Sequence, residues 1–505
     1  MQDHVFTAVS RRRFLATGGA LLGSSVLAGA APSRRGKTIS ILHTTDLHGR
    51  ILPTENYDGL GDLGGFARCA TQIRRWRKEL PDSLLVDIGD VYQGTQVSLQ
   101  SDGTLMIHLM NALGYDAWVL GNHDFDWGRG IAEGALELSR SPVLTANLTV
   151  DGKKPAEAGG AWKKVQPWMV REVGGFRIGL IGLITPGLPH WLAPGTLGGI
   201  SALDPLESLK QSLLEIQAEK PDAIIVLGHM GWRFQDDFAN PVREMLAEMK
   251  EVDVYLAGHS HQDQPSWMTG RVLCSQASYY GIHCGRIDLT FDVESRRLLE
   301  RRAFTVLMDS RFELDPEVME FSKGELAKAD QEMKRKVCTV KKPVTGGARG
   351  SETSRLFCQA FAEALKKEGT LVDGVFHGVF SKDDIPAGDL TVEDCWKLLP
   401  YENRLVVASL TPAELVEILA EDVNQRTLWP FVAATDGAGL LLEGKPLEGG
   451  KRYRVALNSY DGQSAGRRLP KLHQILGRPE SERTETKVET RSALIRCLTE
   501  RKVIE

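Results

Sequence analysis

The stretch Ile39–His48, with the sequence ISILHTTDLH, joins an apolar run to two side chains that can ligate a metal, Asp46 and His48. The apolar part predicts a buried β-strand, and the ligand-type residues follow its end. Similar strand-like runs recur along the next 220 residues: Leu84–Ile88, Trp118–Leu120, Phe176–Ile184, Ala223–Leu227 and Val252–Ala257. Near-continuous Val, Ile and Leu are typical of strands that are covered on both faces.

Amphipathic stretches alternate with these strand-like runs. The predicted helices are Phe66–Trp76, Leu105–Leu113, Leu206–Ala218 and Val242–Met249. Alternating strands and helices indicate a layered α/β domain. Two later runs, Arg286–Asp292 and Arg302–Leu307, have the pattern of antiparallel edge strands.

A polar, charged segment, Pro316–Lys342, interrupts this pattern. It predicts an exposed linker helix, with a solvated helix inside one larger domain as the alternative. Two further helices are expected beyond it, Arg355–Lys367 and Pro412–Glu421, among turn-rich strands. The expected organisation is a catalytic domain over 37–310, a linker helix over 311–342 and a smaller α/β domain over 343–505.

Five of the strand-like runs in the first part are followed by ligand-type side chains. These are Asp46, His48, Asp90, Asn122, His229, His259 and His261, together with His123. Ligands of open α/β sheets gather at the carboxyl ends of the strands. Carboxylate, imidazole and amide groups suit Mn, Zn, Fe or Co. Seven ligands exceed the four of one zinc site, so two divalent ions that share a carboxylate and activate a water molecule are expected.

The motifs around these residues resemble those of the calcineurin-like metallophosphoesterases. They are Asp46-Leu47-His48-Gly49, Gly89-Asp90, Gly121-Asn122-His123-Asp124, Gly228-His229 and Gly258-His259-Ser260-His261. The strings ILHTTDLHGR, GGFARCA, GDVYQGT and GNHDFDWG are similar to the 5′-nucleotidase branch of that superfamily. The resemblance covers most of residues 38–310, and Asp124 stands where the family usually has Glu. It implies a central β-sandwich flanked by helices, followed by a smaller substrate-binding domain.

The resemblance also implies a role for each of these residues. Asp46, His48, Asp90 and His261 would hold one ion, while Asp90, Asn122, His229 and His259 would hold the second. His123 would be the catalytic histidine that stabilises charge developing on the phosphoryl group. Asp126 would orient His123 and favour its charged form; the alternative is that Asp126 caps the following helix.

The C-terminal part resembles the family's substrate domain over Asp389–Leu419, which includes the turn Pro400-Tyr401-Glu402-Asn403. Lys382 stands where the family has a phosphate-binding arginine, and an exposed surface lysine is the alternative. Phe431 matches a ring that stacks on the substrate base or, alternatively, a core residue. The motif that carries the second ring is replaced by Ala465-Gly466-Arg467-Arg468-Leu469, whose arginines favour an anion. Asn122 is expected to contact substrate as well as metal.

The first 31 residues have the pattern of an export signal. Arg11-Arg12-Arg13-Phe14-Leu15 precedes an apolar stretch and a small-residue cleavage site, Ala28–Ala31. The paired arginines resemble a twin-arginine signal, which implies the twin-arginine export machinery as a partner. A mature protein without a membrane span, in the periplasm or outside the cell, is therefore expected.

Composition narrows the choice of partners. Lys and Arg number 61 against 66 Asp and Glu, a net charge of −5 that gives no general attraction to a nucleic-acid polymer. The seven cysteines form no CxxC pair, so neither a disulfide framework nor a cysteine-rich zinc site is indicated. Pairing of Cys274 with Cys284 is left open.

The sequence thus predicts an exported dinuclear-metal phosphohydrolase acting on a small phosphate ester. The resemblance favours 5′-nucleotidase activity, and the alternatives are a UDP-sugar or cyclic-nucleotide phosphohydrolase or a phosphatase of another anionic ester. A catalytically inactive nucleotide-binding scaffold is the alternative outside enzymes. Because every ligand position is filled, the sequence favours an enzyme.

Overall fold

Strand β1 (Gly36–Thr44) opens the described chain and lies inside a seven-stranded sheet. The structure, a computed structural model, describes residues 36–505 apart from 248, 348, 379–383, 423–425 and 435–438. The predicted signal, residues 1–31, and Lys382 therefore lie outside the described residues.

The seven-stranded sheet is mostly parallel. Its order is β15 (Leu298–Leu307), β14 (His283–Asp292), β1, β2 (Ser83–Asp87), β3 (Ala117–Val119), β4 (Val143–Leu144) and β6 (Val165–Gln166). β1, β2, β3, β4 and β6 pair in parallel, whereas β14 and β15 add at one edge as antiparallel strands. The predicted antiparallel pair Arg286–Asp292 and Arg302–Leu307 is confirmed.

A second sheet has six strands. Its order is β12 (Asp263–Thr269), β13 (Val272–Ala277), β11 (Val254–Ala257), β10 (Ala223–His229), β8 (Phe176–Ile184) and β7 (Trp168–Val173). The central strands β8, β10, β11 and β13 pair in parallel, and β7 and β12 are antiparallel at the edges. β10 is buried along its whole length, as its apolar run predicts.

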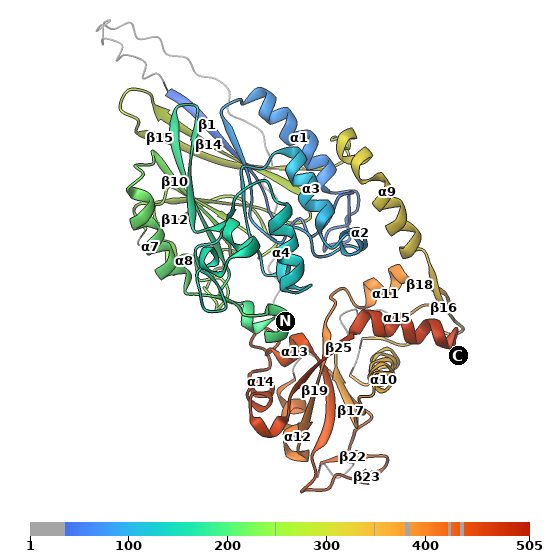
Figure 1. The fold of residues 1–505 in the computed structure, drawn as a ribbon. Helices are drawn as coiled ribbons and strands as arrows, with labels where there is room; N and C mark the ends of the chain where they lie inside the picture. Colours follow the sequence, from blue (N-terminus) through green and yellow to red (C-terminus); the bar gives the residue numbers. More distant parts are fainter. Residues whose placement is uncertain (1–35, 248, 348, 379–383, 423–425, 435–438) are drawn as a thin grey trace, which may run out of the picture. The chain divides into compact units, whose positions relative to one another are not determined.

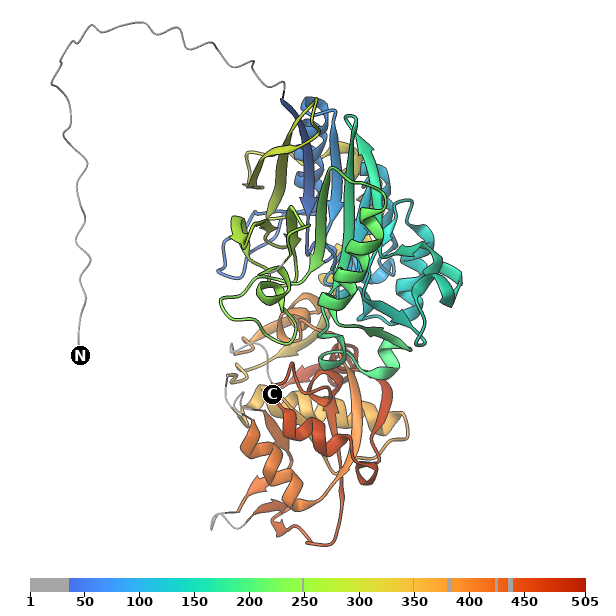
Figure 2. The same cartoon turned by 90° about the vertical axis from the view of Figure 1, so that its left-hand side faces the viewer.

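The two sheets pack face to face and are covered by helices on their outer faces (Figure 1). Because successive strand residues point to opposite faces, Ile39 and Ile41 share one core with Ile225 and Leu227 between the sheets. The outer face of the seven-stranded sheet is covered by α1 (Phe66–Glu79), α3 (Thr104–Leu113) and α4 (Arg129–Leu138). The other outer face is covered by α7 (Pro205–Gln217) and α8 (Val242–Ala247). The expected β-sandwich flanked by helices is confirmed, and Figure 2 shows its strands side by side.

The predicted linker helix is shorter than expected. α9 (Pro316–Met333) ends early, and Lys336–Val340 forms strand β16 between β18 (Gly388–Thr391) and β26 (Val503–Ile504). Val337, Cys338 and Val340 are buried, so this apolar segment stabilises a strand instead of extending a solvated helix. Gly36–Glu505 clusters as one compact unit, and the domain division near residue 342 stays a prediction.

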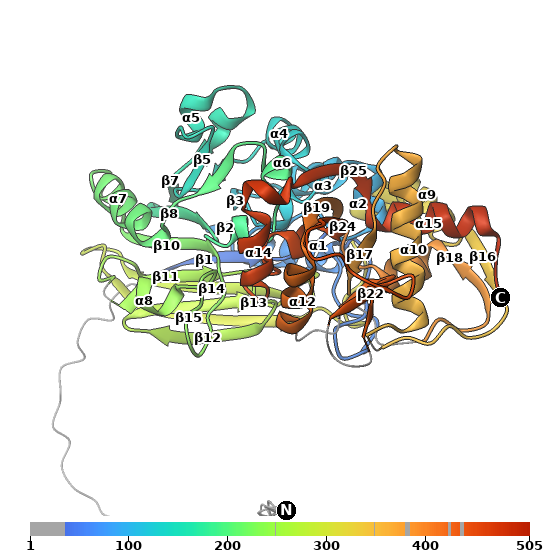
Figure 3. The same ribbon diagram turned by 90° about the horizontal axis from the view of Figure 1, so that it is seen from below.

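The remaining C-terminal residues build a five-stranded sheet. Its order is β20 (Thr427–Trp429), β17 (Gly374–His377), β24 (Tyr453–Asn458), β19 (Arg404–Leu410) and β25 (Thr484–Glu489). Figure 3 shows α10 (Glu352–Lys367) and α12 (Pro412–Glu421) on opposite faces of this sheet. α11 (Val392–Leu398) and α15 (Thr490–Arg501) complete this smaller α/β part, as predicted.

The seven cysteines are buried and free. Cys274 lies in β13 and Cys284 in β14, which belong to different sheets, so the possible pairing is not formed. Across the described residues, no helix combines the length and apolar character that a bilayer crossing requires.

Candidate metal centre and active-site cavity

Five of the predicted ligands have left-handed backbone conformations, which are uncommon outside glycine. They are Asp46 (φ 50°), His48 (φ 48°), Asp90 (φ 57°), His259 (φ 69°) and His261 (φ 55°). Hydrogen bonds between loops hold them, because the Asp46 N–H donates to Gly89 O at 2.9 Å and the His48 N–H to Asp90 O at 2.9 Å. The surrounding structure thus fixes the turns after β1, β2 and β11 in strained conformations of the kind that cluster at functional sites.

A first group consists of Asp46, His48, Asp90 and His261, whose potential ligand atoms all lie within 4.8 Å of one another. The Nε2 atoms of His48 and His261 face each other at 3.0 Å. His261 Nε2 also lies 3.3 Å from Asp46 Oδ1. These residues come from the ends of β1, β2 and β11, so both sheets of the sandwich contribute.

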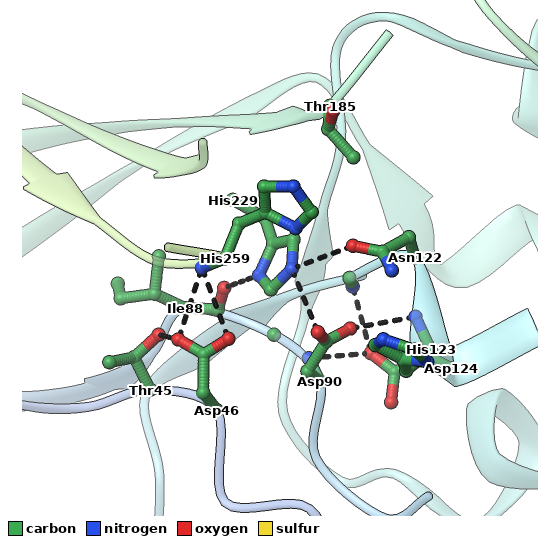
Figure 4. A network of polar contacts seen from close by, with 12 residues as sticks. Thr45, Asp46, Ile88, Asp90, Asn122, His123, Asp124, Thr185, His229 and His259 are labelled. Carbon is green, nitrogen blue, oxygen red and sulfur yellow. Dashed lines mark hydrogen bonds and ion pairs between the residues drawn. The ribbon is translucent and has the colours of Figure 1, made fainter. Parts of the chain in front are cut away.

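A second group consists of Asp90, His229 and His259, again within 4.8 Å of one another. Asn122 adjoins this group, because its Oδ1 lies 3.2 Å from His229 Nε2. Figure 4 shows Asn122, His229 and Asp90 around one point, with His259 beside them. Asp90 is therefore common to both groups, as a bridging ligand must be.

The Asp90 carboxylate is the strongest sign that cations fit here. Its Oδ1 accepts the His123 N–H at 2.8 Å. Its Oδ2 is buried and accepts no hydrogen bond of ordinary geometry from any described residue, although it lies 3.1 Å from His229 Nε2 and 3.7 Å from His48 Nε2. A buried carboxylate oxygen that lacks a well-directed hydrogen bond is costly. A divalent cation on each side would satisfy it.

The outer nitrogens of the histidines are fixed by hydrogen bonds. His48 Nδ1 lies 2.9 Å from Gln93 O, and His229 Nδ1 lies 2.6 Å from Ile88 O. Because a carbonyl oxygen only accepts, each Nδ1 carries the proton and leaves the Nε2 lone pair free to ligate a metal. His261 Nδ1 is paired with the Tyr57 hydroxyl at 2.6 Å. The Nε2 atoms of His48 and His229 therefore face the centre. At His229 a metal would replace the proton that the nearby Asp90 carboxylate favours on Nε2.

The charges at the centre agree with this interpretation. Burial lowers the pKa of His48 and of His259 to about 3, so both imidazoles are neutral near pH 7. Burial would also lower the pKa of His229, but the Asp90 carboxylate raises it to about 9. The Asp90 carboxylate therefore favours a positive charge beside it, and bound divalent cations would provide that charge.

His123 and Asp126 form a pair beside the metal groups. His123 Nδ1 lies 2.7 Å from Asp126 Oδ2. Burial opposes the imidazolium, yet Asp126 and Asp90 raise the pKa of His123 to about 10. The helix after this turn, α4, has Gly128 as its N-cap and no side-chain cap. The alternative role of Asp126 as a helix cap is therefore excluded, and its interaction with His123 remains.

Asp124 has a positioning role that the sequence did not reveal. Its carboxylate accepts the backbone N–H groups of Asp90 at 3.0 Å, Val91 at 2.9 Å and Gly121 at 2.8 Å. It therefore ties the loop after β2 to the loop after β3. The motif placed Asp124 beside the ligands, but the fold was needed to show which backbone amides donate hydrogen bonds to its carboxylate. In the sequence, the available signal for this role was the position of Asp124 directly after His123.

A cavity of about 880 Å³ opens onto the metal groups. Asn122, His123, His259 and His261 line it. Its wall also contains the aromatic side chains Tyr57, Trp127, Trp191, Tyr401 and Tyr460. The Tyr401 ring stacks over the His123 ring, with centroids 6.1 Å apart and planes at 16°. The volume and the mixed polar and aromatic wall suit a small-molecule ligand.

Of the three predicted substrate residues, the structure brings only Asn122 to this cavity. Phe431 is 8% exposed and packs in the C-terminal core edge-to-face on Tyr453, with ring centroids 5.9 Å apart. It does not line the cavity. Lys382 lies outside the described residues. The aromatic residues Tyr401, Tyr460 and Trp191, which do line the cavity, were not singled out as site residues from the sequence.

Comparison with known proteins agrees with this geometry. Residues 39–263 match the family described as calcineurin-like phosphoesterase. The chain is 30% identical over 313 residues to 5′-nucleotidase of Bos taurus, covering 57% of this chain and 52% of that protein. It is 25% identical over 447 residues to a trifunctional nucleotide phosphoesterase of Bacillus subtilis, covering 77% of this chain and 30% of that protein. The chain thus spans about half the length, or less, of these relatives.

Among solved structures, the crystal structure of a 5′-nucleotidase precursor from Thermus thermophilus superposes with a TM-score of 0.70. It is 24% identical, and the match covers 93% of this chain and 97% of that one, so it establishes the fold over nearly the whole chain. The calcineurin-like phosphoesterases are therefore the class of protein that residues 39–263 resemble. Within that class, the relatives named above are 5′-nucleotidases and a nucleotide phosphoesterase.

Proposed function

We propose that this protein is a dinuclear-metal phosphohydrolase. Asp46, His48, Asp90 and His261 would hold one divalent ion, and Asp90, Asn122, His229 and His259 the other. The position of Asp90 Oδ2 is the observation that carries this proposal: it lies between the two groups, is buried and accepts no well-directed hydrogen bond from the described residues. When bound, the ions would supply an activated water and bind the oxygens of the phosphate group; their identity is left among Mn, Zn, Fe and Co.

The other residues of the site would act on the phosphoryl group directly. With Nδ1 held by Asp126, His123 turns its Nε2 to the cavity side and can donate a proton from there to a phosphoryl or leaving-group oxygen. Asp126 fixes the ring orientation and keeps the ring charged. Asn122 would contact both metal and substrate.

We propose a nucleotide as the substrate, with 5′-nucleotidase activity that yields a nucleoside and phosphate. The names of the relatives support this choice, as does a cavity with several aromatic side chains that could stack on a base. A UDP-sugar, a cyclic nucleotide or another anionic ester remains the alternative substrate, and an inactive nucleotide-binding scaffold the alternative without catalysis. A phosphate contact from Lys382 stays a prediction, whereas the buried position of Phe431 favours its alternative role as a core residue.

The test is phosphate release by the purified protein from nucleoside mono-, di- and triphosphates, UDP-glucose, cyclic nucleotides and sugar phosphates, with each metal in turn. We expect turnover that is lost on chelation and restored by metal, with about two ions per chain by elemental analysis. Nucleotide binding without chelator-sensitive turnover would favour the scaffold and overturn the enzyme proposal.

Export through the twin-arginine machinery is part of the same proposal and rests on Arg11-Arg12-Arg13-Phe14-Leu15. The double substitution of Arg11 and Arg12 by Lys keeps the charge but removes the arginine pair. We expect it to retain the protein in the cytoplasm, measured by cell fractionation. Export unchanged by this substitution would contradict the twin-arginine assignment.

A further inference from the structure

The loop Ser464–Arg468 has an unusual backbone. Four successive residues are left-handed: Ser464 (φ 75°), Ala465 (φ 47°), Gly466 (φ 66°) and Arg467 (φ 64°). Hydrogen bonds fix it, because the Ala465 N–H donates to Tyr460 O at 2.9 Å and the Gly466 N–H to His190 O at 3.2 Å. The strain is therefore held in place by contacts on both sides of the loop, as at sites that present a side chain for binding.

Gly466 forms the floor of a small corner rich in hydrogen-bond donors. A methyl group added at Gly466 would lie 3.0 Å from Trp191 Nε1 and 3.5 Å from the Tyr460 hydroxyl oxygen. That hydroxyl accepts a hydrogen bond from Arg468 Nη2 at 2.8 Å, so its own proton remains available. The Trp191 indole N–H has no hydrogen-bond partner within the described part of the chain. Three donors thus surround a space that a side chain at residue 466 would fill.

Arg468 brings positive charge that no carboxylate offsets. No described Asp or Glu forms an ion pair with it, whereas Arg426 in the same cavity binds both Asp422 and Asp461. The neighbouring Arg467 is used differently, because its guanidinium lies over the Phe238 ring at 4.5 Å and donates to His190. An arginine without a carboxylate partner on a cavity wall is suited to a phosphate or carboxylate of a ligand.

This corner adjoins the metal centre. Trp191 connects the two, because its ring packs against the His259 ring with centroids 5.0 Å apart. Trp191, Tyr460 and Arg468 line the same cavity as His123 and His259. If the substrate is a diphosphate with one phosphate at the metals, its second phosphate would therefore lie within reach of the corner.

We infer that Trp191 Nε1, the Tyr460 hydroxyl and the Arg468 guanidinium form a subsite for a second phosphate group of the substrate. This inference rests on the proposed phosphohydrolase function and makes it more specific. The protein should select substrates in which the scissile phosphate is joined to another phosphate, such as nucleoside diphosphates and nucleotide sugars, over nucleoside monophosphates. Arg468 is the specificity-determining residue, and Tyr460 holds its guanidinium in place.

The test compares kcat/KM for ADP and for AMP in the Mn²⁺-loaded protein and in Arg468→Met, which keeps an unbranched apolar stem but removes the charged guanidinium. We expect the ADP-to-AMP ratio to fall about tenfold in Arg468→Met, the loss typical of a hydrogen bond to a charged group. Tyr460→Phe should lower the ratio about threefold. The matched control, Arg467→Met, removes the same charge one residue away and should leave the ratio unchanged.

An unchanged ratio in Arg468→Met, or an equal fall in Arg467→Met, would overturn the subsite. Equilibrium binding of ADP and AMP to chelator-treated protein, measured by calorimetry, separates this outcome from failure of the proposed function. If no variant or parent hydrolyses phosphate esters but ADP still binds more tightly than AMP in an Arg468-dependent manner, the phosphohydrolase proposal fails and the subsite stands. If turnover depends on metal but the ADP-to-AMP ratio does not depend on Arg468, the phosphohydrolase proposal stands and the subsite fails.

Discussion

The ligand loops of the β-sandwich and the loop Ser464–Arg468 both contain strained left-handed residues, but they are held in different ways. The ligand loops follow buried strands and bond to one another, as in the pairs Asp46–Gly89 and His48–Asp90. Ser464–Arg468 is fixed mainly by contacts to nearby backbone, and its two arginines are exposed. The candidate metal ligands thus lie on loops bonded to one another after buried strands, whereas Arg468 lies on the surface, where its substitution leaves the core intact.

The largest effect should follow a change at the residue shared by both metal groups. Asp90→Ala removes the carboxylate that the two groups share, so we expect activity to fall by at least about 10³-fold. Metal content, measured by elemental analysis, should fall with it. An active variant with a full complement of metal would contradict the bridge.

His123→Ala should separate chemistry from metal binding. The imidazole contacts Asp126, and its backbone N–H, which Ala retains, supports Asp90. We expect kcat to fall about 10²–10³-fold with metal content near normal. Loss of metal would instead make His123 a ligand. Asp126→Asn, which leaves the imidazole in place, serves as the milder comparison.

Asp124→Asn tests whether the loop connection supports the metal centre. The variant keeps one side-chain oxygen but loses the charged carboxylate, whose two oxygens accept hydrogen bonds from three backbone N–H groups. We expect metal affinity to weaken about 10–100-fold, as for residues that support ligands without touching the metal. Metal titration of the apoprotein measures this. Unchanged affinity would limit Asp124 to a role in folding, which the melting temperature would report.

Tyr401→Ala examines the C-terminal side of the cavity. Arg491 holds this turn by donating to Leu399 O at 2.8 Å and to Pro400 O at 2.7 Å, and the turn presents Tyr401 to His123. We expect kcat/KM to fall about threefold to tenfold, with most activity retained by Tyr401→Phe, which keeps the ring. Equal loss in both variants would show that the hydroxyl matters more than stacking.

The smallest effect on substrate binding should come from Phe431→Leu. This ring is buried in the C-terminal core, so a hydrophobic replacement should leave the Michaelis constant for AMP within about twofold. Stability should fall by less than about 1.5 kcal/mol, measured by denaturant unfolding. A much larger Michaelis constant would show that Phe431 contributes to substrate binding and would contradict its role as a core residue.

Much of the fold was predictable because local patterns match it. Phe176–Ile184 forms β8 with the predicted bounds, and Pro412–Glu421 forms α12 as expected. The error at Lys336–Val340 arose because a five-residue strand has too few residues to show a clear period, and its partners β18 and β26 lie far along the chain. Such pairing is a tertiary contribution that propensity does not contain.

The ligand types and their places after apolar runs could be predicted from the sequence, because strand periodicity and short motifs are local properties of the chain. Tertiary packing was needed to show that Asp90 Oδ2 lies between two groups that each draw residues from both sheets. It was also needed to show that Asp124 accepts hydrogen bonds from three backbone amides and that Phe431 is enclosed in the core. It also brought Trp191 beside Tyr460 and Arg468. These relations depend on distances between residues far apart in the chain, which packing sets and no local pattern encodes.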